Sequence, residues 1–187
     1  MGEIARSEFV LGGQKSGKSR RAESLARQWC DAAPTHRAVL IATGQAWDEE
    51  MRERIARHQR ERAERVPGMH TVEEPRALAE ALHTHSAPHT LVVVDCLTLW
   101  LTNLLMPAKG DPIDAAAPLQ ALCRAVEDAP GPVVLVGNEI GLGVIPMGRD
   151  VRAFVDALGS LNQAVAASCA RVTLMVAGLP LTLKDAP

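Results

Sequence analysis

A phosphate-binding loop lies close to the start of the chain. Residues 12–19 read Gly-Gly-Gln-Lys-Ser-Gly-Lys-Ser, which has the G-x-x-x-x-G-K-S spacing of that motif. Gly12 and Gly17 let the backbone turn so that successive N–H groups point at an anion, and Lys18 reaches the β- and γ-phosphates. The apolar run before the motif and the helical spacing after it supply the strand–loop–helix context of an anion site. The candidate phosphate-contacting residues are Gly12, Gly13, Gln14, Lys15, Ser16, Gly17, Lys18 and Ser19.

Two oxygen donors are candidates for a Mg²⁺ site. The Ser19 hydroxyl closes the loop motif, and Asp95 follows the apolar run Leu91-Val92-Val93-Val94. In nucleotide-binding α/β proteins an aspartate at such a strand end holds Mg²⁺, directly or through water. The alternative is that Asp95 caps the helix predicted to begin after it.

A second strand end is rich in polar residues and glycine. Val133 to Val136 run into Gly-Asn-Glu-Ile-Gly-Leu-Gly, so Asn138 and Glu139 are expected at the same rim as the phosphate loop. This segment is either a substrate-contacting loop or an ordinary strand–helix connection, and the residues leave both open.

The segment 48–65 interleaves arginine with glutamate and aspartate. Pairs four residues apart, such as Glu61 and Arg65, predict a solvated, salt-bridged helix. One stripe differs, because Met51, Ile55, His58 and Arg62 share a face. From spacing alone, His58 is either a structural histidine at the border of this stripe or a catalytic one.

Composition narrows the classes of partner. The net charge of −2 and the 3% aromatic content argue against a nucleic-acid partner. The apolar runs are of strand length, so we expect no membrane span, and the first residues lack a signal-peptide core. Four scattered cysteines are typical of reduced thiols in a cytoplasmic protein.

Short apolar runs alternate with helical patterns. Strands are predicted over 8–11, 38–42, 91–95, 132–137 and 171–177, and helices over 18–30, 47–65, 75–85, 97–106, 115–128 and 150–169. This alternation predicts an α/β fold that contains the P-loop, with a mostly parallel sheet flanked by helices. We expect a single nucleotide-binding domain over 1–187, with a polar, frayed tail from 184.

An ordered set of motifs resembles one known family. The set comprises GGQKSGKSR at 12–20, IATGQ at 41–45, DEEM at 48–51, RIARH at 54–58, TVEEP at 71–75, VDCLT at 94–98, WLTNL at 100–104, NEIGLG at 138–143 and LNQ at 161–163. Over residues 8 to 184 the chain resembles the bifunctional adenosylcobinamide kinase / adenosylcobinamide-phosphate guanylyltransferases of cobalamin biosynthesis.

The resemblance implies two reactions on one substrate. ATP or GTP phosphorylates the hydroxyl of the aminopropanol arm of adenosylcobinamide. GTP then transfers GMP to that phosphate through a guanylyl-histidine, giving adenosylcobinamide-GDP and pyrophosphate. The family resemblance also implies a requirement for Mg²⁺, a homotrimer with active sites at subunit contacts, and catalytic roles for His58 and Lys18. Beyond residues 12–19, the implied nucleotide contacts are Thr43, Gly44, Gln45, Gln59, Arg60, Glu61, Arg62, Glu73 and Asp95.

Two other functions remain as alternatives. A monofunctional small-molecule P-loop kinase would transfer the γ-phosphoryl group and would not require His58. A GTP-binding switch protein would need a guanine-reading Asn-Lys-x-Asp stretch, and the nearest segment, Asn138-Glu139-Ile140-Gly141, has neither the lysine nor the aspartate.

Overall fold

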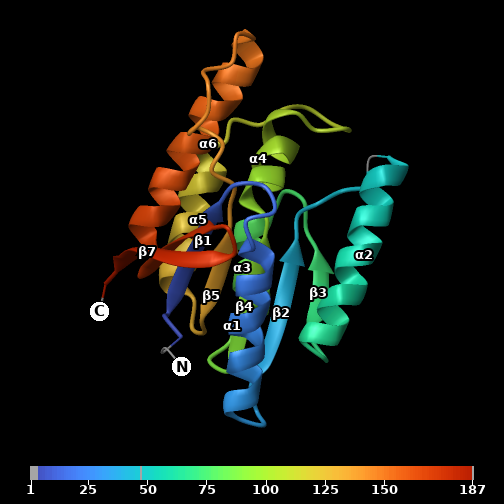
Figure 1. Ribbon diagram of the computed structural model, residues 1–187, viewed down its shortest axis with the longest axis vertical. Coiled ribbons are helices and arrows are strands. Elements are labelled where there is room, and N and C mark those ends of the chain that lie inside the picture. The colour runs from blue at the N-terminus through green and yellow to red at the C-terminus, as the bar shows by residue number, and fades with distance from the viewer. Residues whose placement is uncertain (1–3, 47, 187) are drawn as a thin grey trace.

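The structure, a computed structural model, describes residues 4–46 and 48–186. Strands and helices alternate along most of the chain (Figure 1). The strands are β1 Ser7–Gly12, β2 Arg37–Ala42, β3 His70–Glu73, β4 Thr90–Asp95, β5 Val133–Val136, β6 Arg171–Val176 and β7 Leu179–Asp185. The helices are α1 Lys18–Ala32, α2 Glu49–Arg65, α3 Leu78–His85, α4 Leu97–Leu105, α5 Ala116–Asp128 and α6 Arg149–Ser168. None of the described helices is long and apolar enough to cross a membrane.

The seven strands form one sheet in the order β3-β2-β4-β5-β1-β6-β7. The pairs from β3 to β6 are parallel, and β7 pairs with β6 in the antiparallel sense. The predicted α/β fold with a mostly parallel sheet is confirmed. Parallel strands place their carboxyl ends at one edge, so the loops after β1, β2, β4 and β5 all open at that edge.

Helices cover both faces of the sheet. On one face, α3, α4, α5 and α6 pack against the alternate residues Phe9, Leu11, Val92, Val94, Val133 and Leu135. On the other face, α1 packs against Val10, Leu40, Leu91, Val93, Val134 and Val136, and Val66 at the end of α2 joins this layer. Burial on both faces explains why these strands read as continuous apolar runs.

The structure adds two strands to the prediction. β3 is short and half-exposed, and its sequence His-Thr-Val-Glu carries no apolar run. β7 includes Lys184 and Asp185, so the prediction of a frayed tail from 184 is wrong for these residues. The Lys184 ammonium donates to the carbonyls of Ala166 and Ala167, the last turn of α6, where a cation complements the helix dipole. The predicted helix start at 47 lies outside the described residues, and α2 begins at Glu49.

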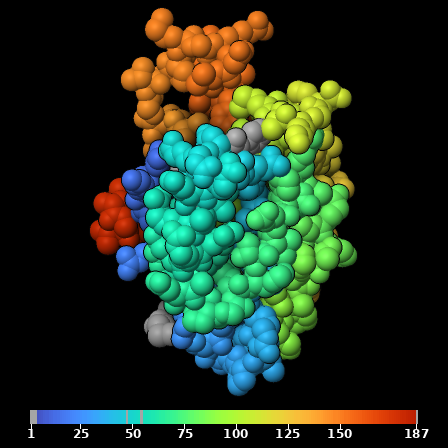
Figure 2. Space-filling model, turned by 90° about the vertical axis from the view of Figure 1, so that its right-hand side faces the viewer, coloured from blue at the N-terminus to red at the C-terminus, as the bar shows by residue number. Residues whose placement is uncertain are grey.

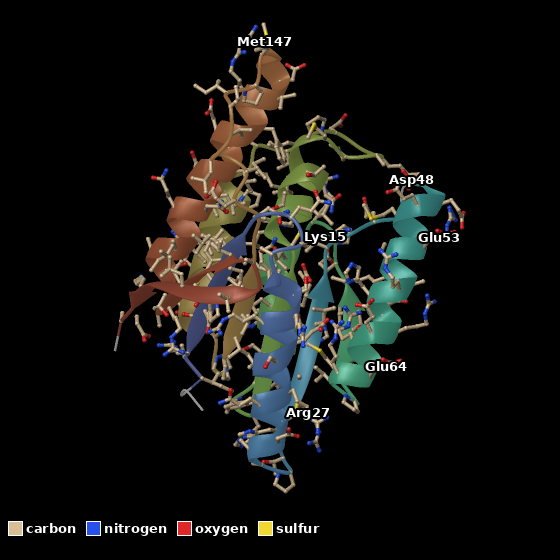
Figure 3. All side chains as sticks on the ribbon, in the orientation of Figure 1. Lys15, Arg27, Asp48, Glu53, Glu64 and Met147 are labelled. Carbon is tan, nitrogen blue, oxygen red and sulfur yellow. The ribbon has the colours of Figure 1, made fainter. Side chains whose placement is uncertain are left out.

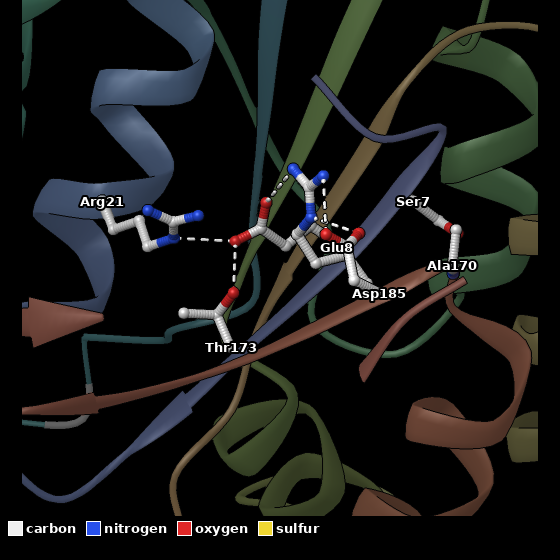
Figure 4. A network of polar contacts seen from close by, with 7 residues as sticks. Ser7, Glu8, Arg21, Ala170, Thr173 and Asp185 are labelled. Atoms are coloured by element: carbon white, nitrogen blue, oxygen red, sulfur yellow. Dashed lines mark hydrogen bonds and ion pairs between the residues drawn. The ribbon is translucent and has the colours of Figure 1, made fainter. Parts of the chain in front are cut away.

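A buried carboxylate in β1 joins four elements (Figure 4). Glu8, 1% exposed, accepts through Oε1 from Arg21 Nε of α1 at 2.7 Å and from the Thr173 hydroxyl of β6 at 2.8 Å. Its Oε2 lies 3.9 Å from Arg171 Nη1, and Arg171 Nε donates to Asp185 of β7 at 2.8 Å. The network ties the helix that follows the phosphate loop to the last two strands.

Replacing this carboxylate is expected to destabilise the fold. Glu8→Ala removes the buried partner of Arg21 and Arg171, whose side chains are 24% and 19% exposed and so keep some hydration. We expect the free energy of unfolding to fall by about 2–4 kcal/mol, below the value for a fully buried pair. Urea unfolding measures it. In the control variant Asp185→Ala, loss of the exposed partner is expected to cost less than about 1 kcal/mol. Equal losses in the two variants would contradict the role given to Glu8.

Candidate active site at the carboxyl edge of the sheet

The phosphate loop connects β1 directly to α1. Gly12 and Gly17 have φ of 153° and 101°, and Gly17 is the N-cap of α1. A Cβ at Gly12 would lie 2.5 Å from Ser16 Oγ and 2.6 Å from the Met175 carbonyl oxygen, so a side chain there has no room. The turn between β6 and β7 supports the loop, because Gly178 N–H donates to the Ser16 carbonyl at 3.1 Å. The glycines at 12 and 17 therefore serve the tight turn that the motif predicts.

The side chains of the loop leave an anion-binding surface. Lys18 is 8% exposed, and its ammonium donates to the Gly13 carbonyl at 2.7 Å, across the loop. Ser16 Oγ is buried and makes no hydrogen bond within the described part of the chain. Gly13, Gln14 and Lys15 are exposed, and Lys15 lies above the start of α1 (Figure 3). A cation, an unused hydroxyl and the N–H groups of a helix start are what a phosphate requires.

The two predicted Mg²⁺ ligands, Ser19 of α1 and Asp95 at the end of β4, lie in contact. Ser19 Oγ donates to Asp95 Oδ2 at 2.8 Å, although β5 separates β4 from β1. α4 has Cys96 as its N-cap and no side-chain cap, so Asp95 pairs with Ser19 instead of capping this helix. Within the described residues no group of three or more His, Cys, Asp or Glu side chains forms a protein cage for a metal. A hydroxyl beside a carboxylate fits Mg²⁺, which usually takes its other ligands from phosphates and water.

A buried polar network fixes the neighbouring loops. The Thr43 hydroxyl donates to the Cys96 carbonyl at 2.7 Å and accepts from Cys96 N–H at 2.9 Å. Asn103 Nδ2 donates to the carbonyls of Thr43 and Pro75 at 2.7 and 3.1 Å. Burial raises the pKa of the Cys96 thiol to about 11, so it stays neutral near pH 7 and is a poor nucleophile. Thr43 and Asn103 therefore position the segments after β2 and β3 against α4.

A pocket of about 510 Å³ lies between these segments and α2. Gly44 and Gln45 line it from the β2–α2 connection, Glu73 from β3, and Ile55 and Gln59 from α2. Thr43, also predicted as a nucleotide contact, is instead fully buried with its hydroxyl engaged by Cys96. The pocket thus gathers four of the predicted contacts, with amide and carboxylate groups that can recognise a polar ring.

Residues at both ends of α2 favour a helix that begins and ends where the structure places it. Asp48 is its N-cap and accepts from Met51 N–H at 2.7 Å, and glutamates follow in the first turn with arginines in the last. Both features complement the helix dipole. The predicted pair Glu61–Arg65 forms, at 3.0 Å. This helix lies at the β3 edge of the sheet (Figure 1), and Arg65 near its end reaches α1.

One face of α2 turns toward α1 and the end of β4. Arg65 Nη1 lies 2.6 Å from Glu23 Oε2 of α1, and Arg62 Nη2 donates to the Thr71 hydroxyl at 3.3 Å. Burial lowers the pKa of the Arg62 guanidinium, while the nearby carboxylates of Glu23 and Asp95 act in the opposite direction. His58, half-buried, precedes Arg62 by four residues and Arg65 by seven, so it shares this face nearer the helix start.

The site residues do not all touch one another. No described hydrogen bond or ion pair joins His58 to the phosphate loop. Arg60 is exposed, and Glu61 pairs with Arg65. Sequence reasoning missed Asn103 and Gly178, which donate to the carbonyls of the predicted residues Thr43 and Ser16, and Glu23, which pairs with Arg65. For Glu23 the available signal was a carboxylate four residues after Ser19 in the predicted helix 18–30.

The polar strand end after β5 is anchored to the site. Glu139 N–H donates to the Gly12 carbonyl at 3.1 Å, and Asn138 N–H donates to the Thr98 hydroxyl at 3.0 Å. Asn162 of α6 donates to the Asn138 carbonyl at 3.1 Å. Beyond these contacts the segment projects with exposed apolar side chains, and Met147 marks its tip (Figures 2 and 3).

Comparison with a solved structure concerns the fold. The flagellar accessory protein FlaH of Methanocaldococcus jannaschii superposes with a TM-score of 0.56, covering 99% of this chain and 81% of that one, at 11% identity. Identity this low supports a shared fold and nothing about activity.

Sequence comparisons are more specific. The chain is 48% identical over 181 residues to the bifunctional adenosylcobalamin biosynthesis protein CobP of Pseudomonas aeruginosa, covering 96% of this chain and 98% of the relative. It is 37% identical to the protein CobU of Escherichia coli, described in the same words, covering 94% and 98%. The family model described as cobinamide kinase / cobinamide phosphate guanyltransferase matches residues 8–183. The chain belongs to this family.

Proposed function

We propose that this protein phosphorylates adenosylcobinamide with ATP or GTP and then transfers GMP from GTP to the product, releasing pyrophosphate and adenosylcobinamide-GDP. The observation that carries the proposal is the arrangement of one α2 face, with His58, Arg62 and Arg65, toward the helix that begins at the phosphate loop. A kinase without a covalent step would not require His58. The cytoplasm, where ATP and GTP are made, is the proposed location.

The kinase step is a problem of positioning and charge. Backbone N–H groups of residues 13–19 and the Lys18 ammonium would hold the β- and γ-phosphates, and the buried Ser16 hydroxyl offers one more donor. Ser19 and Asp95 would hold Mg²⁺, which neutralises charge on the phosphate oxygens. The acceptor hydroxyl oxygen, placed in line, then bonds to the γ-phosphorus as the bond to the β-phosphate oxygen breaks, the nucleoside diphosphate leaves, and the hydroxyl proton passes to a phosphate oxygen or to water.

The pocket beside α2 is the proposed site for the guanine ring. Glu73 presents a carboxylate, which accepts hydrogen bonds, and guanine offers donors at N1 and the 2-amino group. Gln45 and Gln59 offer both donors and acceptors for the remaining ring edge. Gly44 lines the same pocket from the β2–α2 connection.

Guanylyl transfer uses His58 as a nucleophile. Its neutral ring nitrogen forms an N–P bond with the α-phosphorus of GTP as the P–O bond to the β-phosphate breaks, and pyrophosphate leaves with the electron pair. A phosphate oxygen of adenosylcobinamide phosphate next attacks the same phosphorus, the N–P bond breaks, and the neutral imidazole returns. The Arg62 and Lys18 cations stabilise the charge that builds on the phosphate oxygens.

Exposed apolar surface supports the proposed homotrimer. One patch lies on the β6–β7 strand pair and comprises Val176, Leu179, Leu181 and Leu183. The other lies on the segment after β5 and comprises Leu142, Val144, Ile145 and Met147. Exposed patches of this kind mark protein contacts. Two different patches that meet between copies would form a head-to-tail contact, which gives a ring such as a trimer when the rotation between copies closes.

The proposal predicts a covalent intermediate. After incubation with α-³²P-GTP, denaturing electrophoresis should show label on the protein that acid removes and base does not, as a phosphoramidate requires. An ester to serine or threonine would survive acid. With γ-³²P-ATP and adenosylcobinamide, label should appear in the corrinoid. Label in the corrinoid with none on the protein from GTP would favour the monofunctional kinase.

A further inference from the structure

The helix that bears His58 is held by its second half. The described hydrogen bonds and ion pairs that join α2 to other elements come from Arg62 and Arg65, and the buried Val66 follows at once. The first half, including Ile55 and Ala56, instead borders the 510 Å³ pocket. The orientation of His58 therefore depends on contacts made one and two turns farther along the helix.

We propose that Glu23 and Arg65 are positioning residues for guanylyl transfer, a pair that aligns the His58 face of α2 with the phosphate-binding helix α1. The inference rests on the proposed role of His58. Arg65 Nη1 lies 2.6 Å from Glu23 Oε2, a distance typical of a charge-assisted hydrogen bond. The Glu23 side chain is 7% exposed, so solvent screens the pair less than it screens a surface pair.

The directions of α1 and α2 explain how the Glu23–Arg65 pair can determine the position of His58. Both helices start at the carboxyl edge of the sheet and run away from it (Figure 1). Glu23 follows Ser19 by four residues, about 6 Å along α1, and Arg65 follows His58 by seven, about 10 Å along α2. Fixing Arg65 to Glu23 thus sets the height and rotation of His58 relative to the residues that hold the phosphates. The Glu23 charge also opposes the effect of burial on the pKa of the Arg62 guanidinium, which lies one turn before Arg65 on the same face.

The test is the single-turnover rate of protein labelling with α-³²P-GTP, measured beside the kinase rate. Arg65→Ala should slow labelling at saturating GTP roughly 10- to 100-fold, as expected when a reacting group is displaced by about 1 Å. The GTP concentration for half-maximal rate should stay near wild type, because Arg65 does not line the pocket. The kinase rate should fall by less than about threefold, since phosphoryl transfer is proposed to depend on the phosphate loop and on the Ser19–Asp95 magnesium site, and Arg65 instead pairs with Glu23 and Glu61.

Companion variants separate positioning from general stability. Glu23→Gln keeps the side-chain volume, removes the charge and should slow labelling in the same direction, which decides the matter if Arg65→Ala folds poorly. The double variant Glu23→Ala/Arg65→Ala should be no slower than Arg65→Ala, because residues that act as a unit are not additive. Arg27→Ala breaks the exposed Arg27–Asp31 pair of α1 and should leave both rates unchanged.

The outcomes distinguish this inference from the function on which it rests. Label on His58→Ala would overturn the nucleophile assignment itself. If His58→Ala is unlabelled but Arg65→Ala and Glu23→Gln label at the wild-type rate, the positioning role is wrong. A parallel fall of kinase and labelling rates in these variants would also overturn it, because the pair would then support the nucleotide site as a whole.

Discussion

His58→Ala is expected to lose guanylyltransferase activity and to keep kinase activity. The imidazole is needed to carry GMP, whereas γ-phosphoryl transfer to the cobinamide hydroxyl needs positioning and Mg²⁺ without a covalent nucleophile. His58 makes no hydrogen bond with the described residues and is only half-buried on α2. Its loss should therefore lower the free energy of unfolding by no more than about 1 kcal/mol.

Chromatography of the corrinoid products measures this division of labour. Adenosylcobinamide phosphate should accumulate with ATP and GTP present, and the GDP form should be absent. His83→Ala, which changes an exposed histidine of α3, is the matched control and should yield both products. Loss of both products from a well-folded His58→Ala protein would show that His58 serves the nucleotide site generally.

The fold was predictable where burial is two-sided. The strands β1, β2, β4, β5 and β6 lie inside the sheet and each contains a short run rich in Val, Leu or Ile, which is the signal that their prediction used. The edge strands β3 and β7 were not predicted. An edge strand has a neighbour on one side only, and β7 is largely exposed, so polar residues such as Lys184 and exposed leucines are both tolerated there.

The site was predictable where its chemistry is local in sequence. The phosphate loop is a contiguous motif, and the Ser19–Asp95 contact followed from placing an aspartate at the end of a parallel strand. The Glu23–Arg65 pair joins residues 42 positions apart on helices that both carry many charges. Nothing in the sequence selects Arg65 over its neighbouring arginines as the partner of Glu23, so the pair required the structure.

The α2 face that carries Ile55, His58 and Arg62 is a second case in which the sequence does not identify the contact partners. Spacing placed Ile55, His58 and Arg62 on one face, and the structure divides that face between two surroundings. Ile55 borders the pocket, while Arg62 is 9% exposed and reaches the Thr71 hydroxyl of β3. Periodicity gives the angle of a residue around a helix but not which element lies opposite, and for His58 that element decides the chemistry.

Lys18→Ala is expected to damage both half-reactions. The Lys18 side chain is buried at the loop with its ammonium 2.7 Å from the Gly13 carbonyl, and both steps are proposed to draw on a triphosphate held there. Removing one charged phosphate contact typically weakens transition-state stabilisation by about 2–4 kcal/mol, or roughly 30- to 1000-fold in rate. Initial rates of adenosylcobinamide phosphate formation and of GMP labelling of the protein measure the two steps separately. Lys109→Ala, which changes an exposed lysine in the loop after α4, should leave both rates at wild type. A near-normal rate in one step for Lys18→Ala would mean that this step binds its triphosphate elsewhere, and the two nucleotides would then occupy separate sites.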